Sequence, residues 1–249
     1  MIAGCDNNLS WSFKMFLRWV YFQLFIRWHF DGYWVPGRSG YRLMRFLGVP
    51  KKKIYIGSYS ADAELFVNGP ALAMREKRIV YIGRYIALKN VTRFIEAFLS
   101  VPKEVREGWV LETYGCGPEG ERFPKDPAVC VHPFAQSEEL AGVYQRARWF
   151  ALPSLWDHWG LVVHEAALSG CGLLLSTEVG AREDFLEEGV NGYSFSPTNV
   201  QQMREALVQA MKMTDADLER VQSRSLELAA ATSTKCFAKS FLDFAGLGE

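Results

Sequence analysis

The chain has no net charge, and this limits what it is expected to bind. Its 28 Lys and Arg residues balance its 28 Asp and Glu residues over a length of 249. No overall field steers such a chain toward nucleic acid or an anionic membrane, so we expect no nucleic-acid partner. Any anion must be held by a local arrangement of groups. With 49% hydrophobic and 22% charged residues, the composition predicts a soluble globular protein.

Cysteine is also scarce, and its distribution excludes two kinds of site. The five cysteines are odd in number and form no C-x-x-C pair: Cys5, Cys116, Cys130, Cys171 and Cys236. This argues against a disulfide framework and against a zinc site, so we predict a reducing, cytoplasmic compartment. The opening "IAGC" mimics a lipoprotein cleavage box, but no basic and apolar regions precede it, and we interpret it as chance.

Long hydrophobic runs are missing as well. Residues 11–30 are dense in aromatics but are interrupted by Lys14, Arg18 and Arg27, well short of the roughly 20 apolar residues of a spanning helix. On a helix the apolar residues point almost all round, so we favour a helix buried against protein. The alternative is a cationic interfacial helix, which would make the protein peripheral to the inner face of the membrane.

From Arg78 onward, apolar runs alternate regularly with helical segments, without repeats or low-complexity sequence. Earlier elements are a strand at 33–35, a helix near 39–47 and a strand at 54–56. The later strands are expected at 79–83, 109–115, 128–134, 149–154, 172–176 and 191–195, with helices near 90–99, 137–146 and 160–168. Strands that are continuously apolar predict a parallel sheet with helices on both faces, an α/β, Rossmann-like fold.

In such a sheet, ligands lie at the carboxyl ends of the strands. After the first strand of this series come Arg84 and Lys89, in "GRYIALKN", just before the helix near Asn90. A guanidinium and an ammonium beside a helix N-terminus suit a phosphate or diphosphate. The alternative is a pair of solvated surface cations.

The stretch "GCGPEG" matches the G-x-G-x-x-G pattern of dinucleotide sites, through Gly115, Gly117 and Gly120. In a dinucleotide fold this turn follows the first strand and an acid closes the next, whereas here the next strand is followed by His132. We therefore interpret it as a tight glycine turn with Pro118 at the first helical position.

The stretch "PSLWDHWGLVVHEA" carries two acids, Asp157 on the loop after a strand and Glu165 within the next helix. Gly160 permits close approach of a ligand, and the amides of Gly160, Leu161 and Val162 face any anion at this edge. Carboxylates accept hydrogen bonds from ribose or sugar hydroxyls, one acid for each ring. Alternatively, the Asp complements the helix dipole and the Glu lies on a solvated face.

Five stretches in this order resemble one family: "IGRYIALKN", "YGCGPEG", "ELAGVYQRARWFALPS", "DHWGLVVHEAALSG" and "TEVGARED". They resemble the C-terminal, donor-binding domain of the family-4 retaining glycosyltransferases of the GT-B fold, over about residues 78–211. The resemblance implies a nucleotide-diphosphate sugar as co-substrate, no other cofactor and no metal. It also implies a glycan or lipid-linked acceptor and transfer with retention of anomeric configuration.

By this resemblance, Arg84 and Lys89 hold the donor diphosphate and act in catalysis. The predicted donor-sugar site comprises Asp157, His158, Trp159 and Gly160, and the predicted nucleotide site comprises Gly115, Phe134, Leu161, Val162 and Glu165. Within these sets, Asp157 lies by the sugar and Glu165 binds the ribose.

Two positions depart from the family pattern. The first motif acid is Asp rather than Glu, and Gly180-Ala181 replaces the usual Gly-Gly. Both departures concern the sugar contacts more than the fold. We interpret His158 and His164 as packing or helix-surface residues, with His158 the alternative base because it lies on the loop.

The resemblance also divides the chain. Residues 1–72 look like a remnant of the acceptor domain with a linker, 73–232 like the donor-binding domain, and 233–249 like a crossing helix, so we expect a fragment or a shortened chain. Three functions stay open: the donor half of a glycosyltransferase, a non-catalytic nucleotide-sugar-binding or partner subunit, and a GT-B sugar-nucleotide epimerase.

Overall fold

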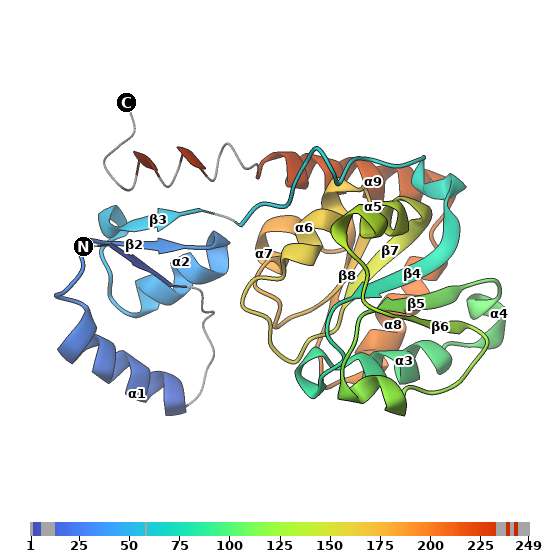
Figure 1. The fold of residues 1–249 in the computed structure, drawn as a ribbon, viewed down its shortest axis with the longest axis horizontal. Helices are drawn as coiled ribbons and strands as arrows, with labels where there is room; N and C mark the ends of the chain where they lie inside the picture. Colours follow the sequence, from blue (N-terminus) through green and yellow to red (C-terminus); the bar gives the residue numbers. More distant parts are fainter. Residues whose placement is uncertain (1, 6–12, 58, 233–237, 240–241, 244–249) are drawn as a thin grey trace.

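The computed structural model describes residues 2–5, 13–57, 59–232, 238–239 and 242–243. In this part of the chain two parallel sheets form, a small one near the N-terminus and a larger one after it (Figure 1). The crossing helix predicted within residues 233–249 falls almost entirely outside the described residues. The division at residues 72 and 232 therefore stays our proposal.

The small sheet has the order β1-β2-β3, with all neighbours parallel. Its strands are β1 (Ile2–Gly4), β2 (Gly32–Val35) and β3 (Ile54–Ile56). Its helical segments are α1 (Phe13–Tyr21), the π-helical turn η1 (Phe22–Ile26), α2 (Gly37–Phe46) and the 3-10 turn η2 (Lys51–Lys53). Strand β1 was not predicted, because three residues carry no readable alternation.

The large sheet has the order β6-β5-β4-β7-β8-β9, again with all neighbours parallel. Its strands are β4 (Glu76–Ile82), β5 (Val110–Tyr114), β6 (Val129–His132), β7 (Ala147–Leu152), β8 (Gly172–Ser176) and β9 (Gly192–Phe195). The helices are α3 (Val91–Leu99), α4 (Lys103–Arg106), α5 (Ser137–Arg146), α6 (Leu161–Leu168), α7 (Arg182–Phe185), α8 (Val200–Met211) and α9 (Asp215–Ala230).

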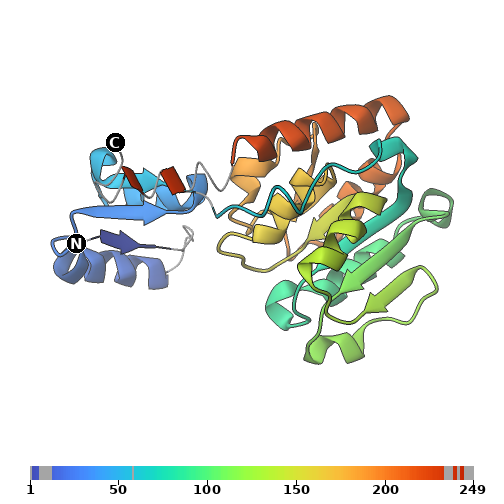
Figure 2. The ribbon, with the colours of Figure 1, turned by 45° about the horizontal axis from the view of Figure 1, so that its top comes forward.

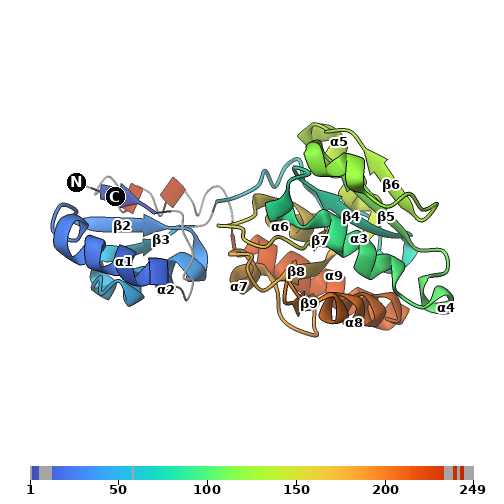
Figure 3. The same cartoon turned by 90° about the horizontal axis from the view of Figure 1, so that it is seen from below.

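Helices cover both faces of the large sheet. Helix α3 packs with α8 on one face, and α5, α6 and α9 pack together on the other (Figures 1 and 3). The strand residues Val80, Phe150 and Leu174 are completely buried between these layers. The strands are apolar on both sides for this reason, and the predicted α/β fold with parallel strands flanked by helices is confirmed.

Within the described residues, a chain segment and a contact between two helices join the small sheet to the large one. Residues 59–75 lead to the large sheet and pass over α6 (Figure 2), where the Ala61 amide donates to His164 Nδ1 at 3.0 Å. Helix α2 also contacts α7, where the Arg38 amide donates to Asp184 Oδ2 at 3.1 Å and Arg42 pairs with Glu183 at 2.7 Å.

Most described side chains of the aromatic segment are exposed or half-buried in this chain. Within residues 16–30, whose side chains the structure describes, Phe22 is the one buried side chain. The large apolar side chains exposed in this segment are Phe16, Leu17, Trp19, Tyr21, Leu24, Phe25 and Trp28. Burial against protein is therefore not observed for most of the segment. Among the described residues, no helix combines the length and apolarity that crossing a membrane requires.

Candidate functional site

A cavity of about 230 Å³ opens at the carboxyl ends of β4, β5 and β6 and is closed on one side by α6. Its lining includes residues predicted to bind the diphosphate and nucleotide: Arg84, Gly115, Phe134, Val162 and Glu165. Tyr114 and Cys116 also line it, although the sequence did not single them out. The fold therefore brings residues as far apart in the sequence as Ile82 and Glu165 to the wall of one cavity.

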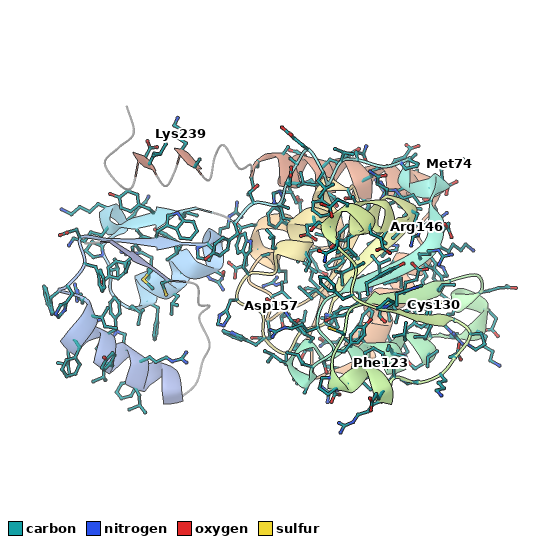
Figure 4. All side chains as sticks on the ribbon, viewed as in Figure 1. Met74, Phe123, Cys130, Arg146, Asp157 and Lys239 are labelled. Carbon is teal, nitrogen blue, oxygen red and sulfur yellow. The ribbon has the colours of Figure 1, made fainter. Side chains whose placement is uncertain are left out.

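Lys89, which follows β4, and Asp157, which follows β7, form an ion pair. Lys89 Nζ lies 2.5 Å from Asp157 Oδ2, and their side chains are 17% and 13% exposed. The Ser154 hydroxyl also donates to Asp157 Oδ2, at 3.3 Å. Lys89, which is predicted to bind the diphosphate, and Asp157, which is predicted to lie by the sugar, are therefore in direct contact. Asp157 lies on the side of the large sheet that faces the small one (Figure 4).

The local backbone explains how Lys89 is placed. It ends the 3-10 turn η4 (Ala87–Lys89), and Asn90 follows in the left-handed conformation with φ of 59°, which Asn adopts more readily than most residues. The Asn90 side-chain amide donates to the carbonyls of Pro153 at 3.1 Å and Pro197 at 2.8 Å. The loop after β4 is thereby fastened to the loop after β7, which carries Asp157.

The Asp157 loop is held equally firmly on its other side. The Asp157 amide donates to the Glu178 carbonyl at 3.1 Å, and the Gly180 amide donates to the Asp157 carbonyl at 3.0 Å. These bonds extend the pairing of β7 and β8 beyond their ends, as an isolated bridge between Asp157 and Val179. The Gly180-Ala181 turn therefore lies beside the predicted sugar position.

Glu165 points toward the cavity from α6 and accepts a hydrogen bond from the Tyr144 hydroxyl at 2.9 Å. Burial raises the pKa of Glu165, while the bond from Tyr144 opposes this shift. Tyr144 is itself fully buried on α5, and burial raises its pKa further above the ordinary value. The sequence did not identify Tyr144, because its partner lies 21 residues away on another helix.

The Trp159 side chain is buried against other parts of the protein. The indole is 3% exposed, it donates to the Tyr59 carbonyl at 3.3 Å, and it packs edge-on against Phe185. The ring is therefore enclosed by protein, and a role of Trp159 in the donor-sugar site stays a prediction. His158 beside it is exposed, and its Nδ1 accepts a hydrogen bond from the Trp156 indole at 3.4 Å.

His164 is a packing residue in this structure. Its Nδ1 accepts from the Ala61 amide, so its Nε2 donates to the Ala229 carbonyl at 3.1 Å. Its ring stacks on Phe185, and burial lowers its pKa. It links the connecting segment to α9 and does not line the cavity.

The start of α6 offers amides to a ligand. Gly160 adopts φ of 91°, and α6 begins at Leu161, so the first amides of the helix have no intrahelical acceptor. Val162 lines the cavity, while the Leu161 side chain is 40% exposed. Asp157, Gly160 and Val162 thus follow one strand end in the order that the sequence predicted.

The glycine turn has a packing explanation. A Cβ at Gly115 would lie 1.9 Å from the Gly83 carbonyl oxygen, and one at Gly117 would lie 2.4 Å from that of Tyr85. Pro118 begins the 3-10 turn η5 (Pro118–Arg122). The tight-turn interpretation is confirmed, and the glycines permit contact between the β4 and β5 loops. Among the described residues, no group of three or more His, Cys, Asp or Glu side chains is arranged to hold a metal ion.

Comparison with solved structures places this arrangement in a class. Anabaena HepE in complex with UDP superposes with a TM-score of 0.79 at 16% identity, over 99% of this chain and 72% of that one. This likeness shows the fold, the α/β architecture of GT-B glycosyltransferases. The family model described as "Glycosyl transferases group 1" matches residues 64–225, which is more than half of the chain. The chain belongs to this family.

Two curated relatives match over shorter stretches. Poly(glycerol-phosphate) alpha-glucosyltransferase of Bacillus subtilis is 27% identical over 141 residues, 54% of this chain and 21% of that protein. Sucrose synthase of Thermosynechococcus vestitus is 29% identical over 106 residues, 41% of this chain and 13% of that protein. The chain thus spans about a fifth or less of the curated relatives it matches.

Proposed function

We propose that this chain is the donor-binding part of a family-4 retaining glycosyltransferase, and that its donor is a UDP-sugar. The observation that carries the proposal is the cavity shared by Arg84 and Glu165, with the Lys89–Asp157 pair at the neighbouring strand end. Such a site offers an acceptor for ribose hydroxyls beside cations for a diphosphate. Among the similar structures, HepE is seen in complex with UDP and with UDP-glucose. One curated relative is named a sucrose synthase and the other an alpha-glucosyltransferase. UDP-glucose is therefore the first donor to test.

In the proposed reaction, the acceptor hydroxyl replaces the diphosphate at the anomeric carbon, on the same face of the sugar. The bond between that carbon and the diphosphate oxygen breaks, negative charge develops on the departing diphosphate, and that oxygen takes the proton that the acceptor hydroxyl loses. Arg84, Lys89 and the first amides of α6 stabilise this charge without a metal ion. Glu165 holds the ribose, while Asp157 accepts from a sugar hydroxyl.

Isothermal titration calorimetry with UDP, GDP, ADP and uridine tests the donor assignment. We expect UDP to bind more tightly than GDP and ADP, and uridine to bind weakly because it lacks the phosphates. Comparable affinity for the three nucleoside diphosphates would contradict the choice of uracil as the donor base, while leaving the diphosphate site supported. Absence of binding by all four would overturn the proposal.

Transfer is a separate test. Holding the acceptor hydroxyl against the anomeric carbon is worth about 7–11 kcal/mol of the barrier, and a small three-stranded unit offers little surface for it. We therefore expect this chain to bind UDP-glucose but to transfer glucose slowly to a panel of glycan and lipid acceptors. Rapid acceptor-dependent transfer would refute the donor-half interpretation. Conversion of UDP-glucose to another UDP-sugar without any acceptor would instead identify an epimerase, and binding with no reaction a partner subunit.

A further inference from the structure

The balanced net charge of the chain conceals a strong separation of charge. Residues 1–57 contain nine Lys and Arg but two Asp and no Glu, a formal charge of +7, whereas residues 58–249 contain 19 basic and 26 acidic residues, a charge of −7. The net charge of the whole chain exerts no attraction on an anionic surface, as expected. The positive charge of the small unit, in contrast, can attract such a surface. Charge asymmetry of this kind is typical of proteins that bind membranes or nucleic acid.

The same unit presents exposed apolar side chains along α1, η1 and the turn that follows, up to Trp28. Trp28 is 76% exposed, Leu24 65% and Phe25 58%. Isolated exposed apolar residues are ordinary, but a contiguous group on one helical segment marks an interaction site. Trp and Phe together with Arg are the side chains that interfacial helices place at the boundary of lipid headgroups and acyl chains.

Hydrogen bonds join the aromatic segment to the basic end of α2. The Gln23 side-chain amide donates to the Leu47 carbonyl, and Arg27 donates to Gln23 Oε1 at 2.8 Å. The Arg27 guanidinium also lies 5.2 Å from the centre of the Trp28 ring. The turn η2, with exposed Lys51 and Lys52 and half-buried Lys53, follows four residues after Leu47. Aromatic anchors and cations therefore belong to one packed unit.

We propose that residues 16–57 form a docking surface for an anionic lipid bilayer, with the exposed aromatic side chains from Phe16 to Trp28 entering the headgroup region and the lysines of η2 adding electrostatic attraction. An acidic protein would match the charge but would not require so many exposed aromatic rings. A cavity of about 400 Å³ beneath α1 supports the lipid assignment, because its lining is mostly apolar and includes Leu17, Phe22 and Leu43. The proposal concerns binding alone and does not depend on the proposed transfer reaction.

Co-sedimentation with vesicles tests this surface on the full chain. We expect binding to vesicles of equimolar phosphatidylglycerol and phosphatidylcholine, little binding to phosphatidylcholine alone, and loss of binding at high salt. Each lysine at such a surface contributes about fivefold, so the triple variant Lys51→Gln, Lys52→Gln, Lys53→Gln should bind about 100-fold more weakly. The double variant Phe25→Ser, Trp28→Ser should lose at least about tenfold.

Matched variants on the large unit provide the controls. Lys103→Gln, Lys125→Gln and Lys212→Gln together remove the same charge from exposed positions. Met74→Ser with Val131→Ser removes two apolar side chains that are 80% and 50% exposed, and Met74 lies at the end of the large unit away from the small sheet (Figure 4). Both controls should bind vesicles as the parent does, and circular dichroism should show that all variants fold.

Three results would overturn the proposal. Failure of the parent chain to bind anionic vesicles would remove it directly. Equal losses in the control variants would mean that binding follows total charge or apolarity and not this surface. Concentration-dependent dimerisation in light scattering, lost in Phe25→Ser, Trp28→Ser and accompanied by no vesicle binding, would assign the surface to a second copy of the chain.

Discussion

Lys89 Nζ and Asp157 Oδ2 lie 2.5 Å apart and join two loops that are 68 residues apart in the sequence. Both side chains are largely buried, so the pair is screened less than a surface ion pair. A diphosphate that binds here must compete with Asp157 for Lys89. In the proposed function, the sugar hydroxyls of a complete donor donate to the carboxylate while the diphosphate takes the ammonium. We therefore expect the pair to favour a donor that satisfies both groups.

Replacing the cations should discriminate between phosphate and nucleoside contacts. Lys89→Ala and Arg84→Ala should each weaken UDP by about 1.5–3 kcal/mol, the value of a charge-assisted hydrogen bond, and leave uridine affinity nearly unchanged. Calorimetry with both ligands measures the difference, with the exposed Lys103→Ala as control. Equal losses for UDP and uridine would show that the cations act through structure.

Asp157→Asn should separate UDP from UDP-glucose. The amide no longer neutralises Lys89, so UDP should bind at least as tightly as to the parent chain. UDP-glucose should lose its advantage over UDP, since Asn accepts hydrogen bonds more weakly than a carboxylate. The ratio of the two dissociation constants is the measurement. A parallel change for both ligands would contradict a role of Asp157 in holding the sugar.

Glu165→Gln should weaken the nucleotide and stabilise the fold. Binding should fall by about 1.5–3 kcal/mol if the carboxylate pairs with ribose hydroxyls, and calorimetry with UDP measures this. The raised pKa of Glu165 means that the folded state favours the protonated form. The folded state then binds more protons than the unfolded state, so ionisation costs stability as pH rises above the ordinary pKa of 4.5.

The thermal midpoint provides the second readout for this variant. Below pH 4 the parent and Glu165→Gln should have similar midpoints, because both side chains are then neutral. The midpoint of Glu165→Gln should exceed that of the parent at neutral pH. Unchanged UDP affinity combined with higher stability would mean that Glu165 serves neither the ribose nor the fold.

His164 should make the fold sensitive to acid. Its pKa is lowered by burial, so the unfolded state binds more protons below the ordinary pKa of 6.5, and stability falls as pH decreases from there. His164→Leu removes this dependence but also two hydrogen bonds, which should cost about 2–4 kcal/mol at pH 8. Urea unfolding at pH 8 and pH 5.5 measures both effects. An equal change of stability between these pH values in the parent and in His164→Leu would contradict the neutral, buried state of His164, because the contribution of Glu165 is common to both.

Much of the large unit could be predicted from sequence because its strands are apolar on both sides. The segments at Ser137–Arg146 and Gly172–Ser176 have the bounds that the pattern predicts. The place of the candidate site could be predicted from the sheet topology, because residues that follow parallel strands meet at one edge of the sheet. Arg84, Gly115 and Val162 line one cavity at this edge. Their roles in binding stay predictions that the experiments above test.

Other features depend on contacts between distant segments. The bond from Tyr144 to Glu165, the Lys89–Asp157 pair and the burial of Trp159 all join elements whose distance no local pattern encodes. The exposure of the aromatic segment could not be predicted for a different reason. Helical periodicity shows where apolar side chains point, but it does not show whether anything covers them.

The contact between Gly37 and Trp159 leads to a final prediction about how the small unit supports the Asp157 loop. Gly37 begins α2 with φ of 55°, and an added Cβ would lie 2.2 Å from Trp159 Cζ3. Gly37→Ala must therefore displace a ring that is 3% exposed, in addition to straining the backbone.

Gly189→Ala is the matched control, because Gly189 has φ of 73° with nothing within 4 Å of the added Cβ. Backbone strain alone should cost about 1–2 kcal/mol in the control, and the clash should add about 1–3 kcal/mol in Gly37→Ala. Urea unfolding of both variants measures this difference, and UDP-glucose titration should show weaker binding by Gly37→Ala alone, because the displaced Trp159 precedes Gly160 on the Asp157 loop. Equal stability and equal affinity of the two variants would contradict a coupling between α2 and the donor loop.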